Sequence, residues 1–153
     1  MVRLDPQNAQ LLLQIYDIRR EARLRQAREW MIGNFWAEDM EGFNAICPPG
    51  TDENAFYRQV TTYWEMVAAI VNRGMLDEDL FFESTTEPLL VWLRVKNVTL
   101  EFRNARKNPL ILRNLEILAE KHEKWLATRA PEALAETRKM LESMRKKATG
   151  AAR

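Results

Sequence analysis

The side chains that most often carry acid–base or metal chemistry are scarce in this sequence. It contains one histidine, His122, and one cysteine, Cys47. Histidine titrates near neutral pH and is a common metal ligand, and structural zinc sites use four ligands, most of them cysteine or histidine. We therefore expect no metal and no cofactor, and we identify no catalytic or cofactor-binding residue.

His122 lies on an apolar stripe between Leu118 and Trp125. A ferritin-like di-metal site requires Glu-x-x-His pairs, whereas the residues three before and three after His122 are Ala119 and Trp125. We favour a histidine at the boundary of the core with one hydrogen-bonded nitrogen, because histidine is of intermediate burial in proteins.

Cys47 stands between Ile46 and Pro48, without a neighbouring cation that would stabilise a thiolate. We expect it to act as a small buried hydrophobe. One cysteine cannot form an intramolecular disulfide, and no basic, apolar leader precedes the first expected helix. No apolar run approaches the roughly 20 residues that span a bilayer. We therefore expect a reducing, cytoplasmic setting and no membrane association.

Other catalytic signatures are missing, including a Gly-rich phosphate loop, a Gly-x-Ser-x-Gly elbow and a His-Glu-x-x-His motif. Carboxylates are plentiful, so an enzyme that uses carboxylates stays open as a less favoured alternative. Most of them fall at expected helix starts or connections, where acids favour the helix dipole and water. These carboxylates are Glu38, Asp39, Glu41, Asp52, Glu53, Asp77, Glu78 and Asp79.

Arginines gather on the first expected helix, at positions 19, 20, 23, 25 and 28. Arg19 and Arg23 lie one turn apart and could follow phosphates. However, Asp17 and Glu21 interrupt the positive field, and 23 basic against 22 acidic residues give the chain a net charge of only +1. Nucleic-acid binding is therefore a disfavoured alternative, and pairing with the acidic stretches is preferred.

Tryptophans supply large rigid surfaces that can fill a core or line a pocket. Five are present, and aromatic residues at helical spacing are more often core. If a pocket for a small molecule or lipid exists, we expect Trp64, Trp92 and His122 to line it.

Prolines and glycines divide the N-terminal half into helical segments. Asp5 and Pro6 give a cap and a first-turn proline, which predict one long helix over about 7–38. Gly42 and the Cys-Pro-Pro-Gly run at 47–50 then interrupt the pattern. Residues 43–46 between them can form one short turn.

The next three segments each have a start signal. Thr51 or Asp52 can cap a second long helix that ends at Gly74. A short helical piece is expected over 77–83. Thr86 and Pro88 start a third long helix that reaches about Lys107, and its apolar residues on two sides predict a central position.

Two more helices complete the expected fold. Asn108-Pro109 opens a fourth helix and Ala130-Pro131 a fifth, with a frayed tail over 148–153. The sequence predicts an all-α protein, with more than two thirds of the residues helical. We expect a compact bundle of about five helices, with a long N-terminal helix, one or two short extra turns and a single domain over 1–147.

The first helix has more apolar surface than its own bundle needs. Six apolar residues within eight positions cover most of its circumference at about 100° per residue. They are Leu11, Leu12, Leu13, Ile15, Tyr16 and Ile18. A helix packed on its bundle buries one stripe, so we expect the rest to contact a second copy or another protein. Other segments of the same chain could instead cover both sides. The expected interface comprises Leu11, Leu12, Ile15, Tyr16 and Arg19.

Several short patterns resemble a helical bacterial family of unknown function over roughly 57–119. They are Tyr63-Trp64-Glu65, the run Arg-Gly-Met-Leu-Asp-Glu-Asp-Leu at 73–80, Trp92 and Arg103. The resemblance implies a bacterial origin and a helical fold, but no reaction.

The sequence thus leaves the function unknown and ranks the alternatives. We favour a non-catalytic helical interaction or regulatory module that associates with itself as a dimer or with a protein partner. A small-molecule or lipid-binding bundle is the alternative.

Overall fold

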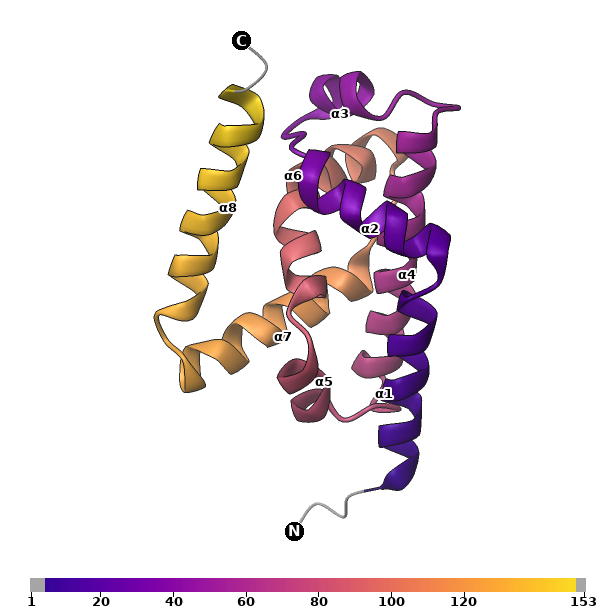
Figure 1. Cartoon of the computed structure of the whole chain (residues 1–153), viewed down its shortest axis with the longest axis vertical. Coiled ribbons are helices and arrows are strands. Elements are labelled where there is room, and N and C mark those ends of the chain that lie inside the picture. The colour runs from indigo at the N-terminus through magenta and orange to yellow at the C-terminus, as the bar shows by residue number, and fades with distance from the viewer. Residues whose placement is uncertain (1–4, 151–153) are drawn as a thin grey trace.

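The computed structural model describes residues 5–150, and helix makes up 80% of this part, with no strand in it. The all-α prediction is confirmed. The prediction of about five helices is wrong, because these residues form eight. Their bounds are α1 Pro6–Arg19, α2 Ala22–Asn34, α3 Met40–Ile46, α4 Asp52–Asn72, α5 Glu78–Ser84, α6 Glu87–Arg106, α7 Arg113–Arg129 and α8 Ala133–Gly150 (Figure 1).

The expected long N-terminal helix is broken into α1 and α2, which run in different directions (Figure 1). The Glu21 side chain begins α2 by accepting hydrogen bonds from the backbone N–H groups of Arg23 at 3.0 Å and Leu24 at 2.8 Å. The buried residues Ile15 and Leu24 are nine positions apart. On one continuous helix at about 100° per residue they would face opposite directions. The break lets both reach the core.

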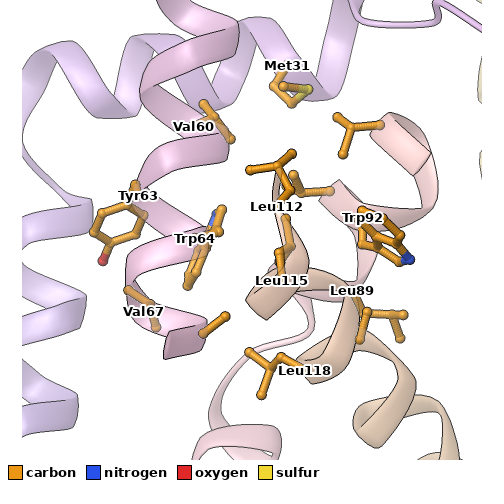
Figure 2. Close-up of a cluster of buried hydrophobic side chains, with 14 of the residues drawn as sticks. Met31, Val60, Tyr63, Trp64, Val67, Leu89, Trp92, Leu112, Leu115 and Leu118 are labelled. Atoms are coloured by element: carbon orange, nitrogen blue, oxygen red, sulfur yellow. The ribbon is translucent and has the colours of Figure 1, made fainter. Parts of the chain in front are cut away.

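α4 and α7 lie at the centre of the fold, since α4 packs against α2, α5 and α7, and α7 packs against α4, α6 and α8. Thr51 caps its first turn, and Gly74 follows its end with a φ of 74°, as the sequence predicts. α6 was expected to be central, but it packs mainly against α3 and α7. Figure 2 shows the core that results, with α7 leucines between α4 and α6.

The connection from α6 to α7 is less regular than the expected restart at Asn108-Pro109. Lys107 and Leu112 both have left-handed backbone, with φ of 50° and 51°. Leu112 provides no side-chain cap to α7. Instead, Glu65 of α4 accepts hydrogen bonds from the backbone N–H groups of Asn114 at 3.0 Å and Leu115 at 2.7 Å. A carboxylate at the positive end of the helix dipole stabilises α7 and ties it to α4.

α8 lies at the side of the bundle, where it packs against α7 (Figure 1). None of its residues is fully buried. Leu134, Leu141 and Met144 form a half-buried apolar stripe. Residues 148–150 of the tail that we expected to be frayed continue this helix, and residues 151–153 lie outside the described part.

Candidate functional site

An apolar groove lies between α1, α4 and α5, with a volume of about 260 Å³; we call it the α1 groove. Its walls come from the N-terminal helix and from residues more than 40 positions further along the chain. The lining residues are Leu12, Leu13, Ile15, Tyr16, Arg19, Trp64, Phe81, Ser84 and Thr85.

Two polar contacts place α1 beside this groove. The Tyr63 hydroxyl of α4 donates a hydrogen bond to the Ile15 carbonyl, which lies in the last turns of α1. At the other end of the helix, the Asp77 backbone N–H donates to the Asn8 side-chain oxygen at 2.7 Å. Ile15 is buried, while Leu11 and Leu12 are half-buried. One face of α1 is therefore packed on the bundle.

Three large apolar side chains of α1 are open to solvent. Leu13 is 66% exposed, Ile18 51% and Tyr16 47%. The Arg19 guanidinium lies over the Tyr16 ring, 4.8 Å from its centroid. The surplus apolar surface expected on the N-terminal helix is thus left uncovered by the described part of the chain.

Four of the five residues expected at an interface share the α1 groove. Leu12, Ile15, Tyr16 and Arg19 line it, whereas Leu11 packs against the core beside it. The far wall consists of Trp64, Phe81, Ser84 and Thr85. Sequence reasoning named Trp64 for a pocket but did not place it opposite the N-terminal helix. Helical periodicity describes one helix at a time and carries no signal for this pairing.

A carboxylate with three polar neighbours lies next to the groove residues Arg19 and Trp64. Glu87, whose side chain is 13% exposed, accepts hydrogen bonds from Arg28 Nε at 2.7 Å and from Arg28 Nη2 at 2.5 Å. Trp64 Nε1 donates to the same carboxylate at 3.2 Å. Arg19 Nη1 stands further away, at 3.8 Å. The hydrogen bonds that Arg28 donates to Glu87 raise the pKa of Arg28, and this pair fixes α2 to the start of α6.

The arginines of α1 and α2 thus include several that face the protein itself. Arg19 and Arg28 turn toward Glu87, and Arg23 Nη2 lies 3.1 Å from Asp52 Oδ1. Pairs of this kind are what the favoured interpretation of the charged stretches predicts.

The three residues expected to line one pocket, Trp64, Trp92 and His122, do not lie together. Figure 2 shows Trp64 and Trp92 on opposite sides of Leu112 and Leu115, which fill the space between them. Both tryptophans are buried. Trp64 also lines the α1 groove, whereas Trp92 lies in the packed core away from it.

His122 lies in a separate aromatic cluster with Phe82 and Trp125. Its ring stacks on Phe82, with 4.4 Å between centroids, and meets Trp125 edge-on at 5.7 Å. It is 1% exposed, so it lies inside the core and not at its boundary as expected. Burial lowers the pKa of His122 to about 4, and Nε2 has no hydrogen-bond partner among the described residues. A neutral imidazole therefore serves here as an aromatic packing element.

Cys47 is completely buried, and burial raises the pKa of its thiol to about 12. A thiol that stays protonated is a poor nucleophile, which agrees with its expected role as a small hydrophobe. Within residues 5–150, no three histidine, cysteine, aspartate or glutamate side chains gather as a metal ion would require.

The polar residues that carry the family resemblance hold helices together. Tyr63 positions α1, Trp64 contacts Glu87, and Glu65 caps α7. Arg103 Nε donates to the Ile111 carbonyl at 2.9 Å, and Arg103 Nη2 lies 2.9 Å from Glu116. These contacts explain why such residues define a fold without defining a reaction.

Comparison with known proteins agrees with this reading. The model of a domain of unknown function, DUF4760, matches residues 6–125, and the chain belongs to this family. The match contains the region 57–119 where the sequence suggested a family of unknown function, and it extends to α1 and α2. It ends before α8.

Searches of curated proteins and of solved structures found no match. None of the helices in residues 5–150 combines the length and apolar character that a bilayer crossing requires. The family and the structure therefore leave the biological function open.

Proposed function

We propose that this protein is a non-catalytic helical interaction module that associates with itself through the α1 groove. The observation that carries the proposal is the exposed apolar surface of α1 at the groove, where Leu13 and Tyr16 are 66% and 47% exposed. Contiguous apolar surface of this kind marks interaction sites on soluble proteins.

The dimensions of the groove favour side chains of another helix as its occupant. Pockets for drug-sized ligands usually measure about 300 to 1,000 Å³ and contain several convergent polar groups. The α1 groove has about 260 Å³, and Arg19 is the one charged residue among the described residues that line it. An amphipathic helix laid in a groove inserts one or two apolar side chains, which this volume suits.

A two-fold dimer would cover the exposed apolar residues of α1 and fill the groove with the same surface. In such a dimer the same patch meets itself, so Leu13 and Tyr16 of each copy would pack over the groove of the other. Arg19 would lie at the rim, where charged residues are common in interfaces. A different protein with an apolar helix could occupy the same place.

The setting of the module is also a proposal. The free, buried Cys47 supports a reducing bacterial cytoplasm. We further propose that residues 1–147 form a single domain that includes α8. Arg145 of α8 supports this, because its Nη1 lies 3.5 Å from Glu38 in the connection before α3.

Replacement of Leu13 by Asp tests the proposal. Leu13 is 66% exposed, so the substitution should leave the fold intact but bury an unpaired carboxylate in the interface. We expect Leu13→Asp to weaken association at least tenfold, measured as molar mass by light scattering with helicity by circular dichroism.

Leu110→Asp is the matched control. Leu110 is 71% exposed and lies in the α6–α7 connection, away from the groove. It should associate like the wild type. Equal effects of the two substitutions, or none from Leu13→Asp, would refute an interface at α1.

A further inference from the structure

A second concave site adjoins the α1 groove and differs from it in character. It has a volume of about 350 Å³ and lies where the ends of α1 and α2 meet the α5–α6 junction; we call it the arginine pocket. Its lining residues are Arg19, Met31, Ile32, Ser84, Thr85, Thr86, Glu87, Leu90, Val91 and Arg94.

The charges around this pocket do not balance. Glu87 is the only carboxylate among the described residues that line it, and Arg28 already occupies both of its oxygens. Arg19 stands 3.8 Å from Glu87, beyond hydrogen-bond distance. Arg94 has no acidic partner within residues 5–150 and donates instead to the backbone carbonyls of Ile32 and Phe35.

Arg94 therefore has no carboxylate partner among the described residues, and Arg19 shares Glu87 with Arg28 at a distance too long for a hydrogen bond. In the described structure, Arg19 Nε and Arg94 Nε are both buried and have no hydrogen-bond acceptor. Burial lowers the pKa of Arg94 to about 10, as expected for a cation that loses water without gaining a counter-charge. Charged groups inside proteins are normally paired and hydrogen-bonded. The Arg94 guanidinium also stacks on the Trp36 ring, 3.6 Å from its centroid, so an acceptor with negative charge is the one kind of partner it still lacks.

Other features of the pocket suit the same partner. Thr86 precedes α6 without making a side-chain cap, and the N-terminus of this 20-residue helix borders the pocket, where the Thr85 hydroxyl accepts a hydrogen bond from the Glu87 backbone N–H at 3.2 Å. The floor is apolar, since Met31 and Val91 are almost fully buried. Ile32, which is 45% exposed, lies on the rim. The pocket thus combines cations with an apolar surface.

We propose that the arginine pocket binds a small organic anion, a carboxylate or phosphate attached to an apolar body. Arg19 and Arg94 would bind the oxyanion, because guanidinium groups match the geometry of carboxylate and phosphate. Met31, Leu90 and Val91 would contact the apolar part. The volume falls within the usual range for small-molecule sites.

This site goes beyond the self-association proposed above and does not depend on it. Leu13 and Tyr16 line the α1 groove but not the arginine pocket. Ile32, Leu90 and Arg94 line the arginine pocket but not the groove. Arg19, Ser84 and Thr85 line both cavities, and so an occupied pocket would fix the Arg19 side chain at the rim of the proposed interface.

Calorimetric titration with four probes tests the anion site. Octanoate and octyl phosphate carry the two oxyanions on one apolar chain, octanol is the neutral analogue, and inorganic phosphate lacks the chain. We expect saturable one-to-one binding of at least one octyl anion and at least tenfold weaker binding of octanol. The stronger of the two octyl anions identifies the headgroup. Tighter binding of inorganic phosphate than of either would exclude the apolar contact.

Variants place the binding in the pocket. Arg19→Gln removes one cation, and Ile32→Glu adds a negative charge at an exposed rim position without disturbing the core. Each should weaken the octyl anion at least tenfold. Arg23→Gln, an exposed arginine paired with Asp52, is the matched control and should bind normally. Leu13→Asp should also bind normally, whether or not it changes association.

Three results would overturn the proposal. The first is that octanol binds as tightly as the octyl anions. The second is that Arg19→Gln and Ile32→Glu both bind normally while circular dichroism shows them folded. The third is that no probe binds saturably. Loss of binding in Leu13→Asp would move the ligand to the α1 groove and would equally contradict the arginine pocket.

Discussion

At the residue scale, the burial of His122 gives it a packing role in place of an acid–base or metal-binding role. The same side chain that made a catalytic or metal site conceivable from the sequence is packed between Phe82 and Trp125. Its position on an apolar stripe was visible in the sequence. Complete burial was not, because that depends on Phe82 of α5, a helix that is 40 positions away in the chain.

The lowered pKa of His122 predicts a pH dependence of stability. The folded state resists protonation down to a pKa of about 4, whereas the unfolded chain takes up the proton near 6.5. The unfolded state therefore binds more protons between these values, so stability falls as the pH decreases from about 6.5 to about 4. The full effect is about 3 kcal/mol at about 1.4 kcal/mol per pKa unit.

His122→Phe should flatten this region of the curve, since phenylalanine can keep the stack on Phe82 without titrating. The measurement is the free energy of unfolding by urea between pH 6.5 and 4.5. Carboxylates such as Glu116, whose pKa is lowered by Arg113 and Arg103, lose their contribution only at lower pH. Glu142→Gln, an exposed control, should leave the region unchanged. An unaltered slope in His122→Phe would disprove the assignment.

At the scale of helices, explicit start and stop signals were reliable. Thr51, Asp77 and Gly74 act where the sequence places them. The break between α1 and α2 contains neither proline nor glycine. The one indication is that Ile15 and Leu24 would point in opposite directions on a continuous helix. α7 starts later than expected because its capping group is Glu65 from another helix, which no local pattern reveals.

The end of α6 offers a test of backbone strain. Lys107 is exposed and has a φ of 50°, in the left-handed region that costs a residue with a β-carbon about 1 to 2 kcal/mol. Glycine adopts this conformation freely and is the usual residue after a helix end. We expect Lys107→Gly to stabilise the protein by up to about 1 kcal/mol, measured by thermal and urea unfolding.

Lys96→Gly is the matched control, because Lys96 is an exposed lysine inside the same helix. Glycine in a helix interior costs about 1 kcal/mol, so this variant should be less stable than the wild type. The two substitutions should therefore have opposite signs. A destabilised Lys107→Gly would show that the left-handed turn is not under strain.

For the whole molecule, the sequence predicted a helical interaction module but could not give the shape of its surface. It singled out Leu12, Ile15, Tyr16 and Arg19 from the excess of apolar residues on one helix. Trp64 and Phe81 join them only because α1 lies alongside α4 and α5. The arginine pocket could not be predicted for the same reason, since Arg19 and Arg94 are 75 positions apart and line one cavity only through tertiary packing.

The molar mass of the wild-type protein across concentration tests the central claim most directly. Sedimentation equilibrium from below one micromolar to tens of micromolar reports it without a label or a substitution. A self-associating module predicts a mass that rises from 18.0 kDa toward twice this value over the series. A mass that stays at 18.0 kDa up to tens of micromolar would contradict self-association through α1.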